Sequence, residues 1–571
     1  MTRKKITNPS SNLPLRICSF GFLILVAVLF FYQFVHGNYY FMRAKNNYVR
    51  LIPSRAIRGA IFDRNGQPLA YDRATFSLSL IPYQSSKIKD IIIKDLSSVL
   101  GYEQSLLHKN YKKNFQNYFS PVNLIDEIDK TTALEVKEKF SDDVLINPQP
   151  QRYYPYPYQF SHVIGYVKNA SIFYEKLKKY GYHPLERVGF SGVEQHYNSY
   201  LKGEDGGDLI EVNSKGKTVG FLGELLPKKG KDIYLTIDKE IQLLAVKILG
   251  KRRGAILLMD SSNGEIIALC SSPSFDLNDF ISGNNIETLL QDKRSPLLNR
   301  ATQSTYPIGS VFKPILGMAG LSEEKITEST IVNCEGSFKL GNTSFRCGQI
   351  HKNQNIYQAL SHSCNTYFYN LGLALGPNLI SKWAQKFNLN KQTGIDIPYE
   401  KSGFIPTVKW KQKIKKQNWF SGDTINLSIG QGYLSVSPIE TLVAINAFAN
   451  GGYIVTPRLI KQIDNTPVNN ATSTDLLMEK TNVDIVTRGL RKVVTDANGT
   501  AHMLDKLNFA VSGKTGTAQN NKAPHGWFIG FFPHKAKKYT LCVFLENCSS
   551  SHKAVEATYI LLKTINAKNL L

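Results

Sequence analysis

The sequence predicts an α+β protein with one N-terminal membrane-spanning helix and a C-terminal domain built on an antiparallel sheet between helices. The first observation is an apolar run from Ile17 to Val35, interrupted only by Ser19, Tyr32 and Gln33. The second is the placement of short β-type segments at both ends of the C-terminal half, around a helical middle. The third is composition: hydrophobic residues make up 42% and charged residues 20% of the 571 residues, which is ordinary for a folded protein.

The apolar run is long enough to cross a bilayer. At a rise of about 1.5 Å per residue it spans about 28 Å, close to the hydrocarbon thickness of a membrane. No A-x-A cleavage pattern follows the run, so we interpret residues 17–37 as an uncleaved anchor and residues 1–16 as a cytoplasmic tail. The basic residues Arg3, Lys4 and Lys5 favour a cytoplasmic N-terminus. The competing interpretation of the run is a buried core helix.

The net charge of +24 would suit a polyanionic partner such as nucleic acid, anionic lipid or another acidic polymer. The lysines, however, are spread along the chain and often stand beside asparagine. This distribution is more typical of a lysine-rich composition than of a binding stripe. We therefore predict that the protein does not bind nucleic acid.

Two domains are expected beyond the anchor, residues 38–230 and residues 231–571, because the composition changes near Asp232. Near the start of the first domain, residues 58–70 predict two short strands around an Asn-Gly turn. Asn65 and Gly66 both tolerate positive φ, as the two central residues of a type I′ turn require.

The rest of the first domain is predicted in three pieces. Residues 85–145 indicate helices and loops, and the run from Arg152 to Tyr158 has too much proline for a central strand and indicates a packed loop. The Gly-, Ser- and Lys-rich passage from Lys202 to Lys231 is typical of a hairpin followed by a linker.

The second domain begins with a strand, Ile233–Asp238, whose last residue is the N-cap of a helix from Lys239 to Gly250. Short apolar segments predict five further strands: Ala255–Met259, Glu265–Cys270, Ala510–Ser512, Trp527–Phe532 and Tyr539–Leu545. An amphipathic helix, His552–Asn566, is expected to close the chain.

Three short motifs occur in order in this second domain. They are S-x-x-K at Ser310–Lys313, S-x-N at Ser363–Asn365, and K-T-G-T at Lys514–Thr517. Each motif alone is common by chance, but their order and their spacings of roughly 50 and 150 residues form a specific set.

The residue types fit acyl transfer. Pro307 and Gly309 break the chain just before Ser310, which places this serine at a helix N-terminus, where developing negative charge is stabilised. Lys313 lies one turn later on the same face, and a desolvated lysine can take the proton of a neighbouring hydroxyl. Lys514, expected at the end of a strand, offers a cation to a substrate carboxylate. The alternative interpretation is that Ser310 only caps a helix and that Lys313 is an ordinary surface lysine.

The motif set resembles that of the class B penicillin-binding proteins, most closely penicillin-binding protein 2, the cell-elongation peptidoglycan D,D-transpeptidase. Further matches extend from residue 58 to about residue 532: Arg58-Gly59, Asp63–Gly66, Arg152 with Tyr154-Pro155, His162–Val167, Gly189–Glu194, Thr393–Asp396, Trp419 with Gly422–Thr424, Ile429–Gly432 and His525–Gly530. Gly526 stands where the family usually has alanine, a swap that changes little in size. The matches before residue 231 are expected to be structural.

The resemblance implies a fold and a mechanism. The first domain would be an elongated, β-rich pedestal of the dimerisation type, and the second a five-stranded antiparallel sheet sandwiched by helices. Ser310, activated by Lys313, would attack the carbonyl between the two terminal D-alanines of a stem peptide, and D-alanine would leave protonated through Ser363. β-Lactams, which mimic this peptide end, would acylate Ser310.

Other residues take their roles from the same resemblance. Asn365 would hold the donor amide and Lys313, and the N–H groups of Ser310 and Thr517 would form an oxyanion hole. The substrate carboxylate would be bound by the third motif, which comprises Lys514, Thr515, Gly516 and Thr517. The chemistry requires no cofactor.

The resemblance also implies a setting. The enzyme would be a single-pass protein of the bacterial cytoplasmic (inner) membrane, with its catalytic domain on the periplasmic side. Its partners would be stem peptides on lipid-linked precursor strands, β-lactams, other elongation-complex proteins and a membrane glycosyltransferase of the shape, elongation, division and sporulation family.

Seven cysteines need a separate hypothesis. Cys334, Cys347, His351 and Cys364 form C-x12-C-x3-H-x12-C, a ligand set that suits structural zinc. Some relatives in the family have a zinc site near this place. The competing interpretation is one disulfide and a free thiol, as an oxidising compartment allows. Cys542 and Cys548 could pair, but packing is the favoured interpretation.

Four rival functions remain at this point. A β-lactamase would need neither the anchor nor the first domain, and a D,D-carboxypeptidase activity could accompany transpeptidation. A non-enzymatic β-lactam sensor or wall scaffold would be expected to carry a cytoplasmic output domain, and only 16 residues precede the expected anchor. A division-specific class B transpeptidase is the nearest alternative.

Overall fold

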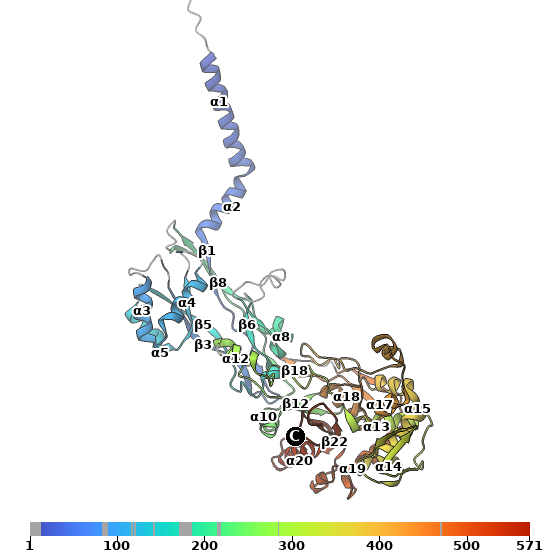
Figure 1. Ribbon diagram of the computed structural model, residues 1–571. Coiled ribbons are helices and arrows are strands. Elements are labelled where there is room, and N and C mark those ends of the chain that lie inside the picture. Colours follow the sequence, from blue (N-terminus) through green and yellow to red (C-terminus); the bar gives the residue numbers. More distant parts are fainter. Residues whose placement is uncertain are drawn as a thin grey trace, which may run out of the picture. The chain divides into compact units, whose positions relative to one another are not determined.

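The computed structural model describes residues 13–80, 82, 89–115, 118, 121–140, 143–170, 186–213, 218–283, 285–468 and 471–571 (Figure 1). The chain forms two compact units that interleave along the sequence. Unit 1 comprises residues 1–57, 74–151 and 204–228, and unit 2 comprises residues 58–73, 152–203 and 229–571.

The anchor of unit 1 is a continuous helical stretch. Helix α1, Leu13–Phe30, continues as a π-helical turn, Phe31–Val35, and is followed by α2, Gly37–Tyr48. Within the described residues, Leu13–Val35 is the one helix long and apolar enough to cross a membrane, and none of it is buried. The predicted apolar helix is therefore present; the basic residues Arg3, Lys4 and Lys5 lie outside the described residues.

The rest of unit 1 has two parts. Strands β1 (Val49–Ser54), β8 (Gly206–Val212) and β9 (Thr218–Leu225) form an antiparallel sheet, which confirms the predicted hairpin. Helices α3 (Lys89–Leu100), α4 (Gln104–Asn114) and α5 (Lys130–Lys139) share a core with β4 (Val122–Ile128). The prediction of helices and loops alone for residues 85–145 is wrong at β4, because its acidic residues interrupt the apolar alternation that marks a strand.

Unit 2 begins with a hairpin of β2 (Ile61–Phe62) and the first residues of β3 (Pro68–Leu80), a strand whose residues from Ala74 onward belong to unit 1. The hairpin is as predicted, but the turn is not type I′. Of its residues only Gly66 has positive φ, at 80°. The Asp63 carboxylate accepts hydrogen bonds from the backbone N–H groups of Asn65 (2.9 Å) and Gln67 (2.8 Å). This side chain fixes the turn, so Asn65 does not need a left-handed conformation.

The run from Arg152 to Tyr158 is a loop only from Tyr154 onward, because β5 (Val144–Tyr153) includes its first two residues. Short elements of unit 2 follow it: α6 (Ser161–Ile164), β6 (Val167–Asn169), β7 (Arg187–Gly189), α8 (Gly192–His196), α9 (Asn198–Leu201) and β10 (Ile233–Leu235). Strand β10 pairs in parallel with β2 and antiparallel with β18 (Ile460–Ile463), which also pairs with β19 (Thr466–Pro467).

A buried ion cluster holds this part of unit 2 together. Glu194 accepts hydrogen bonds from the guanidinium groups of Arg58 (2.6 Å) and Arg152 (2.7 Å), and Arg152 also reaches Asp72 at 3.3 Å. All four side chains are at least 96% buried. Burial alone would raise the pKa of Glu194, but the charges of Arg152 and Arg58 lower it below its usual value.

The main sheet of unit 2 has five antiparallel strands in the order β12-β11-β23-β22-β21, which confirms the predicted sheet. The strands are β11 (Gly254–Asp260), β12 (Ile266–Ser272), β21 (Ser512–Ala518), β22 (His525–His534) and β23 (Lys537–Leu545). Alternate residues of β11 face two different cores: Ile256 and Leu258 pack with α10 (Lys239–Leu249) and α20 (His552–Ala567), whereas Leu257 packs with α13 (Lys313–Ser322) and α18 (Pro438–Ala449).

The predicted strand Ala510–Ser512 is wrong in extent. Strand β21 runs from Ser512 to Ala518 and pairs with β22 along its whole length, so the third motif lies inside an edge strand rather than after one. Two glycines and a lysine interrupt the run of apolar residues by which a strand is recognised in a sequence. The strand forms because it pairs with β22 along its whole length.

The middle of unit 2 is mostly helical (Figure 1). Its helices are α11 (Asp279–Ser282), α12 (Ile286–Gln291), a 3-10 turn (Gly309–Phe312), α14 (Ile356–Ser361), α15 (Asn365–Lys386), α16 (Val408–Trp410), a π-helix (Lys411–Lys415), α17 (Ser421–Ser428), α19 (Lys480–Thr495) and a second 3-10 turn (His502–Lys506). Small hairpins and bridges join them: β13 (Val332–Cys334) with β16 (Lys352–Gln354), β14 (Ser337–Leu340) with β15 (Thr343–Arg346), and β17 (Tyr453–Val455) with β20 (Ser473–Asp475).

Candidate active site

Ser310 lies in a 3-10 turn that leads directly into α13. Gly309 has φ of 60° and donates its N–H to the carbonyl of Gly430 at 2.9 Å, and the Trp527 indole N–H donates to the Pro307 carbonyl at 3.1 Å. The serine is thereby fixed against the sheet. Residues three apart lie above one another in a 3-10 turn, so Ser310 and Lys313 share one side, although the turn is tighter than the predicted α-helix.

Lys313 is fully buried and meets the second motif. Its Nζ donates to the Ser363 carbonyl (2.7 Å), to Asn365 Oδ1 (2.7 Å) and to Ser363 Oγ (3.2 Å). The ring of Phe368 lies 5.4 Å away. Burial lowers the pKa of Lys313 to about 8, because desolvation destabilises the ammonium form.

The second motif lies between α14 and α15, where Ser363 has φ of 54° and Asn365 is the first residue of α15. Asn365 is fixed at both ends of its amide, because Oδ1 accepts from Lys313 and Nδ2 donates to the Arg346 carbonyl at 3.2 Å. Its backbone N–H donates to Cys347 Sγ, also at 3.2 Å. The position of this amide is thus set by the loop that contains Arg346 and Cys347.

Lys514, in edge strand β21, is also fully buried. Its Nζ lies 3.2 Å from the Thr515 carbonyl, and within the described part of the chain no carboxylate lies within 4.0 Å of it. Burial first, and then the charge of Lys313, lower the pKa of Lys514 well below its usual value. Two lysine side chains therefore lie close together in a buried site, and neither has a carboxylate partner among the described residues.

Three residues that the sequence prediction did not select support the third motif. Thr515 Oγ1 donates to Thr500 Oγ1 (2.7 Å), Thr517 Oγ1 donates to Ser551 Oγ (3.2 Å), and Gln431 Nε2 lies 3.5 Å from the Thr517 carbonyl. Gln431 stands in a stretch already matched to the family, Ile429–Gly432. Thr500 and Ser551 carry no local signal, because only the fold brings them to β21.

The four residues of the cysteine-histidine set lie together. Their donor atoms are all within 4.8 Å of one another. His351 Nδ1 is 3.5 Å from Cys334 Sγ and 3.4 Å from Cys347 Sγ, and Cys364 is the N-cap residue of α15. Tetrahedral zinc with ordinary bond lengths places sulfur and nitrogen donors about 3.5 Å apart, so this donor set fits a zinc ion.

The other cysteines pack as single thiols. All seven cysteines are free; Cys270 and Cys542 are buried in the sheet, and Cys548 is half-buried. The expectation that Cys542 and Cys548 pack rather than pair is confirmed. The exchange of glycine for alanine at position 526 is small in size, but the site has no room for a methyl group, since a Cβ there would lie 2.5 Å from Cys548 Sγ and 2.7 Å from the Ser550 carbonyl oxygen.

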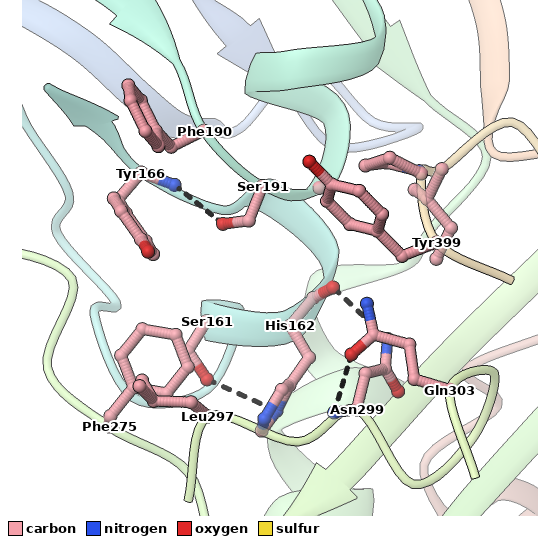
Figure 2. A pocket seen from close by; sticks show the side chains of 13 residues that line it. Ser161, His162, Tyr166, Phe190, Ser191, Phe275, Leu297, Asn299, Gln303 and Tyr399 are labelled. Atoms are coloured by element: carbon pink, nitrogen blue, oxygen red, sulfur yellow. Dashed lines mark hydrogen bonds between the residues drawn. The ribbon is translucent and has the colours of Figure 1, made fainter. Parts of the chain in front are cut away.

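A separate pocket of about 190 Å³ lies outside the three motifs (Figure 2). Figure 2 shows Tyr166, Phe190, Tyr399 and His162 around it. None of its lining residues is acidic, lysine or arginine. Burial lowers the pKa of His162 to about 4, so this side chain is a neutral donor to the Pro296 carbonyl at 2.8 Å. Ser161 Oγ lies 3.4 Å from His162 Nδ1 in this pocket, but none of the lining side chains is a cation that could bind a carboxylate, so the three motifs are the candidate active site.

Comparisons with known proteins agree with this geometry. Residues 254–565 match the penicillin binding protein transpeptidase domain, and residues 53–235 match the penicillin-binding protein dimerisation domain. The peptidoglycan D,D-transpeptidase MrdA of Haemophilus influenzae is 31% identical over 92% of this chain and 87% of its own length. The MrdA protein of Escherichia coli K12 is 31% identical over 87% of this chain and 82% of its own length.

Solved structures show the same similarity. The penicillin-binding protein PBP2 of Helicobacter pylori, solved in complex with MreC, superposes with a TM-score of 0.82 at 29% identity, covering 92% of this chain and 100% of that chain. PBP2 of Pseudomonas aeruginosa superposes with a TM-score of 0.69 at 27% identity, covering 90% of this chain and 96% of that chain. The resemblance drawn from the motifs is confirmed: this chain belongs to the class B penicillin-binding proteins, with a dimerisation domain followed by a transpeptidase domain.

Proposed function

We propose that this protein is a peptidoglycan D,D-transpeptidase that joins wall stem peptides through an acyl-enzyme on Ser310. The observation that supports this most strongly is Lys313, a fully buried ammonium group 2.7 Å from both Asn365 Oδ1 and the Ser363 carbonyl, with no carboxylate to balance it. We assign residues 1–16 to a cytoplasmic tail, 17–37 to the anchor, 38–230 to the pedestal and 231–571 to the transpeptidase domain.

In the first step, Ser310 Oγ attacks the carbonyl carbon between the two terminal D-alanines, and Lys313, as a neutral amine, takes the hydroxyl proton. With a pKa of about 8, about one Lys313 in ten is neutral at pH 7. The backbone N–H groups of Ser310 and Thr517 stabilise the oxyanion, each donor typically contributing about 3 kcal/mol. The C–N bond then breaks, and the proton passes from Lys313 through Ser363 to the departing D-alanine.

In the second step, the amine of another stem peptide attacks the ester carbonyl. The new amide bond forms as the ester bond breaks, and Ser310 recovers a proton from the attacking amine through Lys313. Water in place of the amine would give D,D-carboxypeptidase activity. Asn365, whose amide is held at both ends, fixes Lys313 and the donor peptide during both steps.

The terminal carboxylate of the donor is bound by Lys514, Thr515 and Thr517. Charge-assisted hydrogen bonds to a carboxylate supply the counter-charge that Lys514 lacks. Gly516 has a steric role, since a Cβ there would lie 2.8 Å from Val311 Cγ2 and 2.9 Å from the Ile308 carbonyl oxygen. Glycine therefore lets the edge strand contact the turn that carries Ser310.

We also propose that Cys334, Cys347, His351 and Cys364 hold a structural zinc ion. Bound zinc would fix the thiolates and tie the loop before α15 to the small hairpins, and it would take no part in the acyl transfer. The support is the fit of the donor spacing. Metal analysis of the purified protein should find about one zinc per chain, and replacing Cys347 with serine should lower both the zinc content and the melting temperature. A Cys334–Cys347 disulfide in peptide mapping would refute the zinc site.

We place the enzyme in the bacterial cytoplasmic membrane, with the catalytic domain on the periplasmic side, acting in cell elongation and rod-shape maintenance. The similarity to MrdA proteins supports this role. A related structure, 26% identical with a TM-score of 0.72, is described as a peptidoglycan synthase complex that coordinates polymerization and crosslinking. Partners would accordingly be a membrane glycosyltransferase of the shape, elongation, division and sporulation family and MreC-like elongation proteins. Depletion should give round cells, whereas filaments would indicate a division role.

The test of the transpeptidase proposal is labelling with a fluorescent penicillin. The wild-type chain should be acylated on the peptide that contains Ser310, and Ser310→Ala should show no labelling while keeping its melting temperature. The wild-type enzyme should also release D-alanine from a D-Ala-D-Ala peptide. An unlabelled wild-type protein that also leaves this peptide intact would overturn the proposal.

A further inference from the structure

Lysines are spread along most of the chain, but they are concentrated in one exposed segment of unit 2. Residues 401–422 contain no aspartate or glutamate, and five lysines occur within eight positions: Lys409, Lys411, Lys413, Lys415 and Lys416. Four of them are exposed, while Lys411 is buried and paired with Asp423. We call residues 408–420 the lysine segment.

The lysine segment is held in a defined conformation by a helix cap and by aromatic packing. Thr407 caps α16 by accepting a hydrogen bond from the Trp410 N–H at 3.1 Å, and the chain then forms a π-helix that ends at Lys416 with φ of 55°. Trp410 packs against Phe404 and Tyr433, with ring centroids 4.8 and 5.0 Å apart. Both π-helices and left-handed non-glycine residues are uncommon and cluster at functional sites.

The segment lies between two parts of the active site. At one end, Lys415 Nζ is 5.5 Å from the ring of Tyr433, two residues after Gln431, whose amide reaches the Thr517 carbonyl at 3.5 Å. At the other end, a Cβ on Gly422 would lie 3.5 Å from Phe345.

Phe345 is next to Arg346, whose carbonyl holds the Asn365 amide. Helix α17, which follows the segment, packs on α15, the helix that begins with Asn365. The lysine segment and the residues that directly follow it therefore contact parts of the chain next to both the second and the third motif.

The exposed ammonium groups have no acidic partner in the part of the chain that the structure describes. Within the described residues, no carboxylate lies within 4.0 Å of Lys409, Lys413, Lys415 or Lys416, and the adjacent Asp423 is already occupied by Lys411. Lysines elsewhere often do pair, as Lys139 does with Glu135. Like charges this close repel one another, so an anion bound here would relieve the repulsion and be attracted from a distance.

We propose that the lysine segment binds the carboxylates of the acceptor stem peptide, the one that brings the attacking amine. This inference rests on the proposed transpeptidase function. The donor carboxylate is already assigned to the buried Lys514, and the donor is held covalently once the acyl-enzyme has formed. The acceptor is a second anionic peptide that must be held without a covalent bond, and the segment offers exposed cations near the same motifs.

The test replaces the three lysines without ring contacts, in the triple variant Lys409→Gln, Lys413→Gln and Lys416→Gln of the full-length protein. The matched control is Lys109→Gln, Lys112→Gln and Lys113→Gln, which removes the same charge from exposed positions on α4 of unit 1. In separate samples, one portion of each protein is titrated with a fluorescent penicillin to measure acylation, and an untreated portion is assayed with a donor D-Ala-D-Ala peptide and an acceptor peptide amine, either with free carboxylates or with all carboxylates amidated.

The segment variant should be acylated by penicillin at the wild-type rate, while its KM for the free-carboxylate acceptor rises about tenfold and more acyl-enzyme is hydrolysed. Its KM for the amidated acceptor should match the wild type, and the control should match the wild type throughout. Equal loss with both acceptors, unchanged KM for the free-carboxylate acceptor, or loss of penicillin acylation in the segment variant would each overturn the inference. Failure of wild-type acylation would instead refute the transpeptidase proposal.

Discussion

Two clusters of buried ionisable side chains in unit 2 differ in whether their charges are paired. Around Glu194, two arginines face two carboxylates, and the charges of Arg152 and Arg58 lower the pKa of Glu194 despite its burial. In the active site, Lys313 and Lys514 are just as buried but have no acidic partner among the described residues. The first arrangement stabilises a fold, and the second leaves positive charge available for a substrate.

The pKa values express the same difference. Near Glu194 the charges of Arg152 and Arg58 overcome desolvation and lower the carboxyl pKa. Near Lys313 desolvation dominates and lowers the pKa to about 8, close to the value a general base needs. Paired buried charge therefore indicates structure here, and unpaired buried charge indicates catalysis.

The largest effect should follow from breaking the paired cluster. Glu194→Gln would leave Arg58 and Arg152 as buried cations with weakened partners, so the free energy of unfolding should fall by about 3–5 kcal/mol. Denaturant unfolding measures this. The control is Glu204→Gln, which removes a surface pair with Lys228 and should change stability by less than about 1 kcal/mol. A fall in stability as small as that of the control would show that the cluster is not structural.

The opposite result is expected from the unpaired cluster. Lys514→Met removes a buried charge without a partner, so stability should stay the same or rise. Penicillin acylation should slow by about 10- to 100-fold, because a charge-assisted hydrogen bond of about 1.5–3 kcal/mol to the drug carboxylate is lost. Melting curves and stopped-flow acylation measure the two quantities. A large loss of stability with an unchanged acylation rate would show that Lys514 stabilises the fold and does not bind the drug carboxylate.

The lowered pKa of Lys313 predicts a pH profile. Only the neutral amine can accept the Ser310 proton, and its fraction rises as pH rises toward the pKa of about 8. The rate constant for acylation should therefore increase about tenfold per pH unit between pH 6 and 7 and level off above about pH 8. The measurement is single-turnover acylation with a penicillin whose own charge is constant over this range. A flat profile from pH 6 to 8 would contradict the role of Lys313.

A smaller effect concerns Gly526. Gly526→Ala should lower stability by about 1 kcal/mol, because the added methyl group must displace the Cys548 thiol. Adding Cys548→Ala should recover part of the lost stability. Thermal unfolding of the wild type, both single variants and the double variant measures this as a double-mutant cycle. If the two substitutions act independently, Cys548 is not what requires glycine at this position.

The grouping of the three motifs could be predicted from sequence because they are short and occur in a fixed order. Ser310 and Lys313 are three residues apart, so local geometry alone places them together. Four strands of the main sheet, β11, β12, β22 and β23, were also predictable because they are apolar, whereas β21 was placed only in part because its residues are mostly small and polar.

The supporting contacts could not be predicted, because they depend on tertiary structure. Thr500 and Ser551 reach β21 only through folding, and neither stands in a recognisable motif. The Asn-Gly turn was misjudged because the Asp63 side chain, rather than the backbone preference of Asn65, sets its geometry. The effect of Gly526 depends on Cys548, whose contact no local pattern reveals.

The most direct test is the acylation rate of Ser310 in Lys313→Met, followed by intact mass and peptide mapping after exposure to a penicillin. Methionine fills a similar volume without the amine, so we predict a melting temperature at or above that of the wild type and acylation slowed at least about 1000-fold. Acylation of Ser310 in this variant at close to the wild-type rate would contradict the account.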